Sequence, residues 1–327
     1  MPDFTSHSAR NPKPPLTPPL AKRVGGSLTA LVTPFKDIQL DVPALARLAT
    51  RQIAHGTAGL VVCGSTGEAQ SLSTAEFARA IAAVAEVAAG KAPVIAGCTA
   101  SSTTMALVLA EAAVHAGADA LLCAVPPYVK PTQDGIFAHI RAIAHRADLP
   151  VVLYDVPSRS GVAIADETIA RLFDAELIIG LKDATADLSR PPRLRALCGD
   201  GLIQLSGDDA TTAGYCAMGG DGSISVTANV TPAVCAMLHR AWDRGDRSNF
   251  AAVRDLLHPL HAAMFAESNP IPVKAALSQL GLCTDDVRLP LTRATLATQE
   301  RLMRLLPNLM VTEAHAAGAH ASHALVS

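Results

Sequence analysis

The sequence lacks the features that would direct it to a nucleic acid or a membrane. Charged residues make up only 17% of the chain, below the ~25% typical of soluble domains. The 27 basic and 29 acidic residues nearly cancel, giving a net charge of -2. The chain therefore has no overall electrostatic attraction to nucleic acid or to an anionic membrane. No apolar run reaches the roughly 18 residues of a membrane span. We therefore expect a soluble, cytoplasmic protein with no nucleic-acid and no membrane partner.

The patterns expected of a metal, redox or dinucleotide site are missing as well. The seven cysteines contain no CxxC pair, and several lie inside apolar runs, which is typical of small buried hydrophobic residues in a reducing compartment. None of the eleven histidines follows a predicted strand, so a metal-dependent aldolase is disfavoured. No GxGxxG follows the first predicted strand. We expect no metal and no cofactor.

The two ends of the chain differ in composition from the rest. Residues 1–24 are rich in proline (NPKPPLTPPL) and have no apolar signal-peptide core, which predicts a disordered N-terminal arm rather than a secretory signal. Residues 313–327 (EAHAAGAHASHALVS) predict a flexible tail. Its three histidines could bind a metal, although a solvated tail is favoured.

Between these ends, short apolar runs alternate with helical patterns. The runs are rich in Val, Ile and Leu on both faces, as a buried parallel sheet requires. The predicted strands are residues 28–33, 59–63, 94–97, 121–125, 151–155, 177–182, 202–206 and 223–226. The predicted helices include residues 42–55, 74–89, 102–116, 135–146 and 166–173. Eight such strands, recurring every ~20 to 35 residues, predict a (β/α)8 TIM barrel.

The barrel is predicted to cover residues 25–245. The segment beyond Pro232 lacks strand signals, so we expect a last barrel helix and then a C-terminal helical appendage over residues 246–312.

Polar side chains gather where the predicted strands end, which is where barrel enzymes place their active residues. These ends are Gly64-Ser-Thr-Gly-Glu68, Pro126-Pro-Tyr128, Tyr154 to Gly161, Lys182, Ser206 to Asp209 and Gly222 to Val226.

Lys182 is the leading candidate for a nucleophile. It closes the apolar run Leu177-Ile-Ile-Gly-Leu181 and is the only lysine between Lys130 and Lys274. Burial lowers the pKa of an amine, as Schiff-base formation requires. The alternative is a strand-ending lysine with its ammonium in solvent.

The neighbouring candidates also have two interpretations each. Tyr154 could transfer protons, or it could be a core residue whose ring is buried and whose hydroxyl reaches solvent. The loop with Ser65 and Thr66 could bind a carboxylate at a helix start or only cap that helix. Arg159 could hold a second carboxylate through two parallel hydrogen bonds or form a weak surface ion pair. Asp208 and Asp209 could be an N-cap and a first-turn acid.

Six motifs together resemble the dihydrodipicolinate synthase family, within the pyruvate-dependent lyases that also include N-acetylneuraminate lyase. The resemblance runs from about Gly26 to Arg293. Its motifs are GSTGE, YDVPSRSG, IIGLKDAT, SGDDA, GSISVTANV and NPIPVKAAL.

The resemblance implies a lyase that joins pyruvate to L-aspartate 4-semialdehyde, forming 4-hydroxy-tetrahydrodipicolinate on the route to lysine. It implies that Lys182 forms the Schiff base and that Tyr154, Ser65 and Tyr128 form a proton relay. For substrate binding it implies Thr66 at the pyruvate carboxylate, Arg159 at the semialdehyde carboxylate, and the backbone of Gly207 and Ile224 near the nucleophile. In this family Tyr128 would enter a neighbouring subunit's site, which implies a homotetramer.

The sequence departs from the family pattern at two places. Ser65 stands where the synthases usually have threonine, and the neuraminate lyases have this same serine. Arg159 points the other way, because those lyases lack it. In the pocket of lysine-inhibited members, Met105 replaces a carboxylate, Phe77 a histidine and Pro127 a tyrosine. Lysine bound there would lose hydration without compensation, so we expect weak or no inhibition by lysine.

Two alternatives stay open: a related lyase for another aldehyde, and a non-catalytic paralogue that binds an oxo acid.

Overall fold

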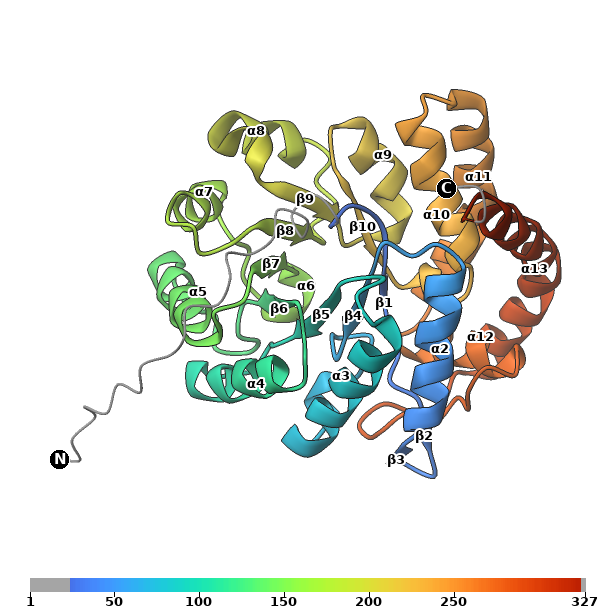
Figure 1. The fold of residues 1–327 in the computed structure, drawn as a ribbon, viewed down its shortest axis with the longest axis horizontal. Coiled ribbons are helices and arrows are strands. Elements are labelled where there is room, and N and C mark those ends of the chain that lie inside the picture. The colour runs from blue at the N-terminus through green and yellow to red at the C-terminus, as the bar shows by residue number, and fades with distance from the viewer. Residues whose placement is uncertain (1–23, 325–327) are drawn as a thin grey trace.

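The computed structural model describes residues 24–324, and a closed barrel of eight parallel strands forms its centre (Figure 1). The first strand pairs with both the second and the last barrel strand, which closes the ring. The barrel strands are β1 (Gly26–Ala30), β4 (Gly59–Val62), β5 (Val94–Gly97), β6 (Ala120–Ala124), β7 (Val151–Asp155), β8 (Gly180–Asp183), β9 (Ile203–Ser206) and β10 (Gly222–Ser225). This confirms the predicted TIM barrel. The predicted N-terminal arm lies, up to residue 23, outside the described residues.

Helices surround the strands, and four of them begin at side-chain caps that are visible in the sequence. Asp41, Ser73, Ser102 and Thr132 each accept a hydrogen bond from the first turn of the following helix, which fixes where that helix starts. The helices are α2 (Val42–Ala54), α3 (Thr74–Ala88), α4 (Thr103–His115), α5 (Gln133–Ala147), α6 (Pro157–Ser160), α7 (Asp166–Asp174), α8 (Arg190–Cys198), α9 (Thr212–Ala217) and α10 (Pro232–Asp243).

Smaller elements lie between the barrel units. They are the hairpin of β2 (Phe35–Lys36) and β3 (Gln39–Leu40), and the 3-10 turns η1 (Ala69–Ser71), η2 (Gly199–Gly201), η3 (Asp209–Thr211) and η4 (Thr227–Asn229). The sixth barrel strand starts at Gly180, not at residue 177 as predicted. A Cβ at Gly180 would lie 2.7 Å from the Ile203 carbonyl oxygen, so the close approach to β9 begins there, whereas Leu177 packs outside the strand.

Three helices follow the barrel and gather beside α10 and α2 in Figure 1: α11 (Arg247–Met264), α12 (Ile271–Gln279) and α13 (Leu296–Ala324). The predicted flexible tail was wrong for residues 313–324, which belong to α13. The reason is a tertiary contact: the buried carboxylate of Glu313 accepts hydrogen bonds of 3.0 Å from the backbone N–H groups of Ala233 and Val234, at the start of α10.

Two further properties concern residues 24–324 only. In this part of the chain, no three His, Cys, Asp or Glu side chains are grouped so that they could hold a metal ion. Its helices include none that is both long and apolar enough to cross a membrane.

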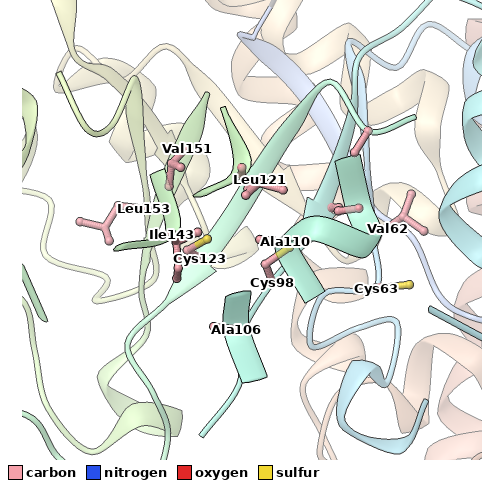
Figure 2. Close-up of a cluster of buried hydrophobic side chains, with 14 of the residues drawn as sticks. Val62, Cys63, Cys98, Ala106, Ala110, Leu121, Cys123, Ile143, Val151 and Leu153 are labelled. Carbon is pink, nitrogen blue, oxygen red and sulfur yellow. The ribbon is translucent and has the colours of Figure 1, made fainter. Parts of the chain in front are cut away.

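A large apolar layer packs between the barrel and the helices, and three cysteines belong to it (Figure 2). Cys63, Cys98 and Cys123 are buried and free. Five of the seven cysteines are buried and the other two are half-buried, which confirms their predicted use as small apolar residues.

Candidate active site

A cavity of about 320 Å³ lies at the carboxyl ends of the strands and collects most of the predicted site residues. Its lining includes Lys182, Tyr154, Ser65, Thr66, Arg159 and Gly207. These residues come from four separate βα segments, and only the barrel closure brings them together.

Lys182 lies on β8 with 6% of its surface exposed, so the alternative of an ammonium in bulk solvent was wrong. It is the register partner of Tyr154 on β7, and its Nζ lies 4.3 Å from the centre of the tyrosine ring. Burial, opposed by the nearby carboxylate of Asp209 and assisted by the guanidinium of Arg159, lowers the pKa of Lys182 to about 8. The neutral amine is therefore accessible near neutral pH.

Tyr154 is 8% exposed. Burial raises its pKa to about 12, with Asp155 contributing in the same direction and Arg159 opposing it. The phenol therefore stays protonated at neutral pH and can donate a proton or a hydrogen bond beside the amine.

The Gly64–Glu68 segment forms a tight turn after β4. The Gly67 N–H donates to the Gly64 carbonyl at 3.0 Å, and Glu68 takes a φ of +51°. A Cβ at Gly67 would lie 3.1 Å from the Cys63 backbone nitrogen, so a larger residue there would crowd this turn. The turn places Thr66, 3% exposed, in the cavity wall.

This turn does not begin an α-helix, which corrects the helix start assumed in both interpretations, while carboxylate binding by its hydroxyls stays a prediction. The short η1 follows it, and α3 has its own cap at Ser73. Ser65 and Thr66 therefore do not cap α3, and a carboxylate bound by them would not lie at the N–H groups of its first turn.

Arg159 lies at the exposed edge of the cavity on α6. Its Nη2 donates to the Asn269 carbonyl at 3.2 Å. Over residues 24–324 no carboxylate lies within salt-bridge distance of it, so the surface ion pair considered for Arg159 is not found. Its charge is available to an anionic ligand.

The remaining predicted residues have different positions. Gly207 lines the cavity, and a Cβ there would lie 3.0 Å from Cε of Lys182. Ile224, 1% exposed, belongs to the barrel interior and is absent from the cavity lining. Tyr128 is 94% exposed with a φ of +75°, and this chain does not bring it into its own cavity.

Asp208 occupies the N-cap position and Asp209 the first turn, as considered, but of the short η3, and the Asp208 side chain makes no capping hydrogen bond. Asp208 lines the cavity. Asp209, 4% exposed, accepts hydrogen bonds from the backbone of Val226 and Thr227 after β10. Its carboxylate therefore fixes the end of β10.

Sequence reasoning missed one wall of the cavity. The segment between α11 and α12 contributes Phe265, Glu267, Ser268 and Asn269. It follows no barrel strand, so the strand-end rule could not find it. The only signal was the NPIPVKAAL motif, which starts at Asn269.

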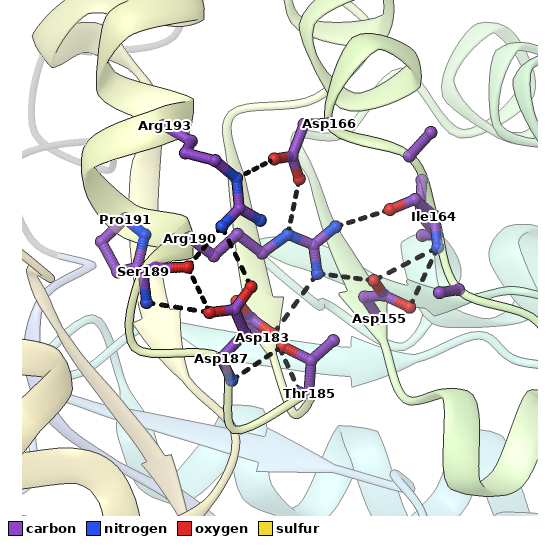
Figure 3. A network of polar contacts seen from close by, with 12 residues as sticks. Asp155, Ile164, Asp166, Asp183, Thr185, Asp187, Ser189, Arg190, Pro191 and Arg193 are labelled. Atoms are coloured by element: carbon purple, nitrogen blue, oxygen red, sulfur yellow. Dashed lines mark hydrogen bonds and ion pairs between the residues drawn. The ribbon is translucent and has the colours of Figure 1, made fainter.

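A buried ion network lies behind the ends of β7 and β8 (Figure 3). Arg190, with a side chain 4% exposed, donates to Asp155 at 2.7 Å and to Asp166 at 2.9 Å, and it lies 3.5 Å from Asp183. Burial raises the pKa of Asp155 despite the guanidinium beside it. Because side chains alternate along a strand, these carboxylates point away from the cavity that Tyr154 and Lys182 face.

The fold and this geometry define a (β/α)8-barrel enzyme equipped for imine chemistry on a small carbonyl compound. A buried amine of lowered pKa is the nucleophile that such chemistry needs. The protonated phenol beside it and the guanidinium at the rim suit proton transfer and carboxylate binding.

The comparisons with known proteins agree with that class. The model of the dihydrodipicolinate synthetase family matches residues 23–309. A 4-hydroxy-tetrahydrodipicolinate synthase from Rhodospirillum centenum is 49% identical over 84% of this chain and 94% of its own, and one from Hyphomonas neptunium is 50% identical with the same coverage. The crystal structure of a chloride-inhibited dihydrodipicolinate synthase from Acinetobacter baumannii, complexed with pyruvate, has a TM-score of 0.85 and 39% identity, covering 88% of this chain and 99% of its own. This chain belongs to the dihydrodipicolinate synthetase family, and it is a lyase.

Proposed function

We propose that this chain condenses pyruvate with L-aspartate 4-semialdehyde to form 4-hydroxy-tetrahydrodipicolinate. The observation that carries the proposal is Lys182, buried at the end of β8 with its pKa lowered to about 8 and its Nζ over the Tyr154 ring. The names of the relatives support the reaction, and the relative complexed with pyruvate supports the first substrate.

In this proposal the neutral amine of Lys182 attacks the ketone carbon of pyruvate. Loss of water from the carbinolamine gives an imine, whose positive nitrogen draws electrons from the adjacent methyl group. A proton leaves that methyl group, and the resulting enamine attacks the aldehyde. The amino group of the semialdehyde then attacks the imine carbon, which closes the ring and releases Lys182 as the free amine. Tyr154 lies beside the amine and carries the protons, together with Ser65 and with Tyr128 of a neighbouring subunit.

Two groups bind the substrate carboxylates. Thr66 in the buried turn would hold the carboxylate of pyruvate. Arg159 would hold that of the semialdehyde, since its guanidinium is at the cavity edge with no ion-pair partner among the described residues. Because Gly207 has no side chain, Lys182 has room to move between its covalent states. Ile224 packs in the barrel interior behind Lys182.

We also propose a cytoplasmic homotetramer in which Tyr128 completes the site of a neighbouring subunit. Tyr128 and Val129 are 94% and 55% exposed, and an apolar pair this exposed suits a protein interface. Sedimentation should give four times the chain mass, and Tyr128→Phe should lower kcat without changing that mass. A monomeric enzyme of full activity would contradict this assembly.

The proposed enzyme resists inhibition by lysine. Phe77 is 1% exposed in the core, and Met105 is an apolar side chain 40% exposed. Neither can compensate the two ammonium groups of lysine with a carboxylate. Steady-state rates with and without sub-millimolar lysine test this directly, and clear inhibition would contradict it.

Reductive trapping tests the central step. Borohydride treatment with pyruvate should add one fixed mass to the chain, and peptide mapping should place it on Lys182. Lys182→Met should abolish the adduct, whereas Lys91→Met, at an exposed position, should leave it unchanged. Absence of an adduct in the wild-type protein would refute the imine and favour a non-catalytic paralogue.

The second substrate is tested separately. A coupled assay with aspartate semialdehyde, against a panel of other aldehydes, should show the highest kcat/KM with the semialdehyde. Arg159→Ala should damage that step far more than pyruvate trapping, because the guanidinium binds the semialdehyde carboxylate directly and affects trapping only through the pKa of Lys182. Strong trapping combined with a preference for another aldehyde would point to a related lyase.

A further inference from the structure

The segment between α11 and α12 contacts two of the proposed carboxylate-binding residues through a single residue. Asn269 is 9% exposed and lines the cavity. It lies 203 positions from Thr66 and 110 from Arg159, yet it hydrogen-bonds to both. It is not part of the imine chemistry proposed above.

The side chain of Asn269 determines how the Thr66 hydroxyl is used. The Asn269 Nδ2 donates to Thr66 Oγ1 at 2.9 Å. An amide N–H group is a donor only, so the hydroxyl accepts in this contact and keeps its own hydrogen for another partner. Thr66 is 3% exposed and faces the cavity. A carboxylate can only accept hydrogen bonds, so a hydroxyl with its hydrogen directed into the cavity suits it.

The backbone of Asn269 has a separate contact. Its carbonyl accepts from Nη2 of Arg159 at 3.2 Å, which holds the guanidinium at the cavity edge. This contact does not depend on the side chain at position 269. Substituting the side chain should therefore affect one carboxylate site and leave the other in place.

The Oδ1 atom of Asn269 supports a role toward a ligand. It is buried and has no hydrogen-bond partner within residues 24–324. A buried acceptor without a partner is destabilising, and such atoms are concentrated at sites that bind a ligand or an ordered water. Packing alone would be served as well by an apolar residue of the same shape.

We infer that Asn269 is a positioning residue for the oxo-acid substrate: it directs the Thr66 hydroxyl hydrogen toward the pyruvate carboxylate. This inference rests on the proposed function and extends it beyond the barrel. It makes the segment after α11 part of the substrate site.

The test compares Asn269→Leu and Asn269→Asp, which keep the approximate shape of the side chain. Leucine removes the donor, and aspartate turns it into an acceptor that captures the Thr66 hydrogen. The pyruvate concentration for half-maximal trapping should rise about 10-fold for leucine, the effect of one hydrogen bond to a charged group, and further for aspartate. The KM for the semialdehyde should change by less than about two-fold, because the Arg159 contact uses the backbone.

A double-mutant cycle separates this role from a general structural one. In a Thr66→Val background the hydroxyl is gone, so Asn269→Leu should have no further effect on pyruvate half-saturation. Asn308→Leu, on an exposed part of α13, is the matched control and should behave like the wild-type protein. If the leucine variant does not fold, as judged by its melting curve, Asn269→Ser serves the same cycle.

Three results would overturn the inference: unchanged pyruvate half-saturation, equal losses for both substrates, or full additivity with Thr66→Val. These outcomes differ from failure of the proposed function. If wild-type protein forms no adduct with pyruvate at Lys182, the imine mechanism itself is wrong, whereas normal wild-type trapping with unaffected Asn269 variants refutes only the role of Asn269.

Discussion

The pH dependence of imine formation is the sharpest test of the environment around Lys182. Burial brings its pKa to about 8 from the ordinary 10.5. At pH 7 about one amine in ten is then neutral, compared with about one in three thousand at the ordinary value. The structure therefore predicts a gain of about 300-fold in reactive amine near neutrality.

The rate of adduct formation with pyruvate, followed by intact mass after reductive trapping, should rise about tenfold per pH unit below the pKa and level off above it. Two variants should displace this curve in opposite directions. Arg159→Met removes a cation that lowers the pKa of Lys182, so the curve should move to higher pH. Asp209→Asn removes an anion that raises that pKa, so the curve should move to lower pH.

Lys182→Met provides the blank, since it has no amine to trap. A wild-type inflection near 10.5 would refute the argument, because burial would then have no effect on the amine. A shift in the same direction for the Arg159 and Asp209 variants would also refute it, because the two side chains act with opposite signs.

Two further perturbations affect stability. Lys182→Met should raise the free energy of unfolding by about 3 kcal/mol at pH 7, because burial opposes the charged lysine. In urea titrations the gain should be complete below pH 8 and disappear as the pH rises toward 10.5. Arg190→Gln should lower the free energy of unfolding by about 3–5 kcal/mol, since it leaves buried carboxylates without their cation. The loss should shrink at lower pH because Asp155, whose pKa is already raised, can take up a proton. Arg193→Gln is the control in the same melts, with a far smaller loss, because its side chain is 47% exposed.

The sequence predicted the barrel well, because each barrel unit repeats the same local signals. A short apolar run gives a strand that is buried on both faces, and caps such as Ser73 fix the helix starts. Within the site, the strand-end rule found Lys182, Tyr154 and Gly207, because it depends only on where each strand stops.

The contributions it missed all depend on tertiary contacts. Asn269 reaches Thr66 from beyond the barrel repeat, and no local pattern marks such a contact. Residues 313–324 resemble a solvated tail in composition, yet they are helical, and within them Glu313 satisfies the first N–H groups of α10.

The network around Arg190 explains how a reactive lysine can be held in place without contacts that would compromise its reactivity. An ion pair on the amine itself would raise its pKa. Instead, Asp183 and Asp155, the residues directly after Lys182 and Tyr154, are register partners that approach one guanidinium on the outer face of the strands. The ends of β7 and β8 are thereby fixed from behind, while the inner face stays apolar enough to lower the pKa of the amine. It follows that Arg190 variants which still fold should slow adduct formation, although Arg190 does not line the cavity.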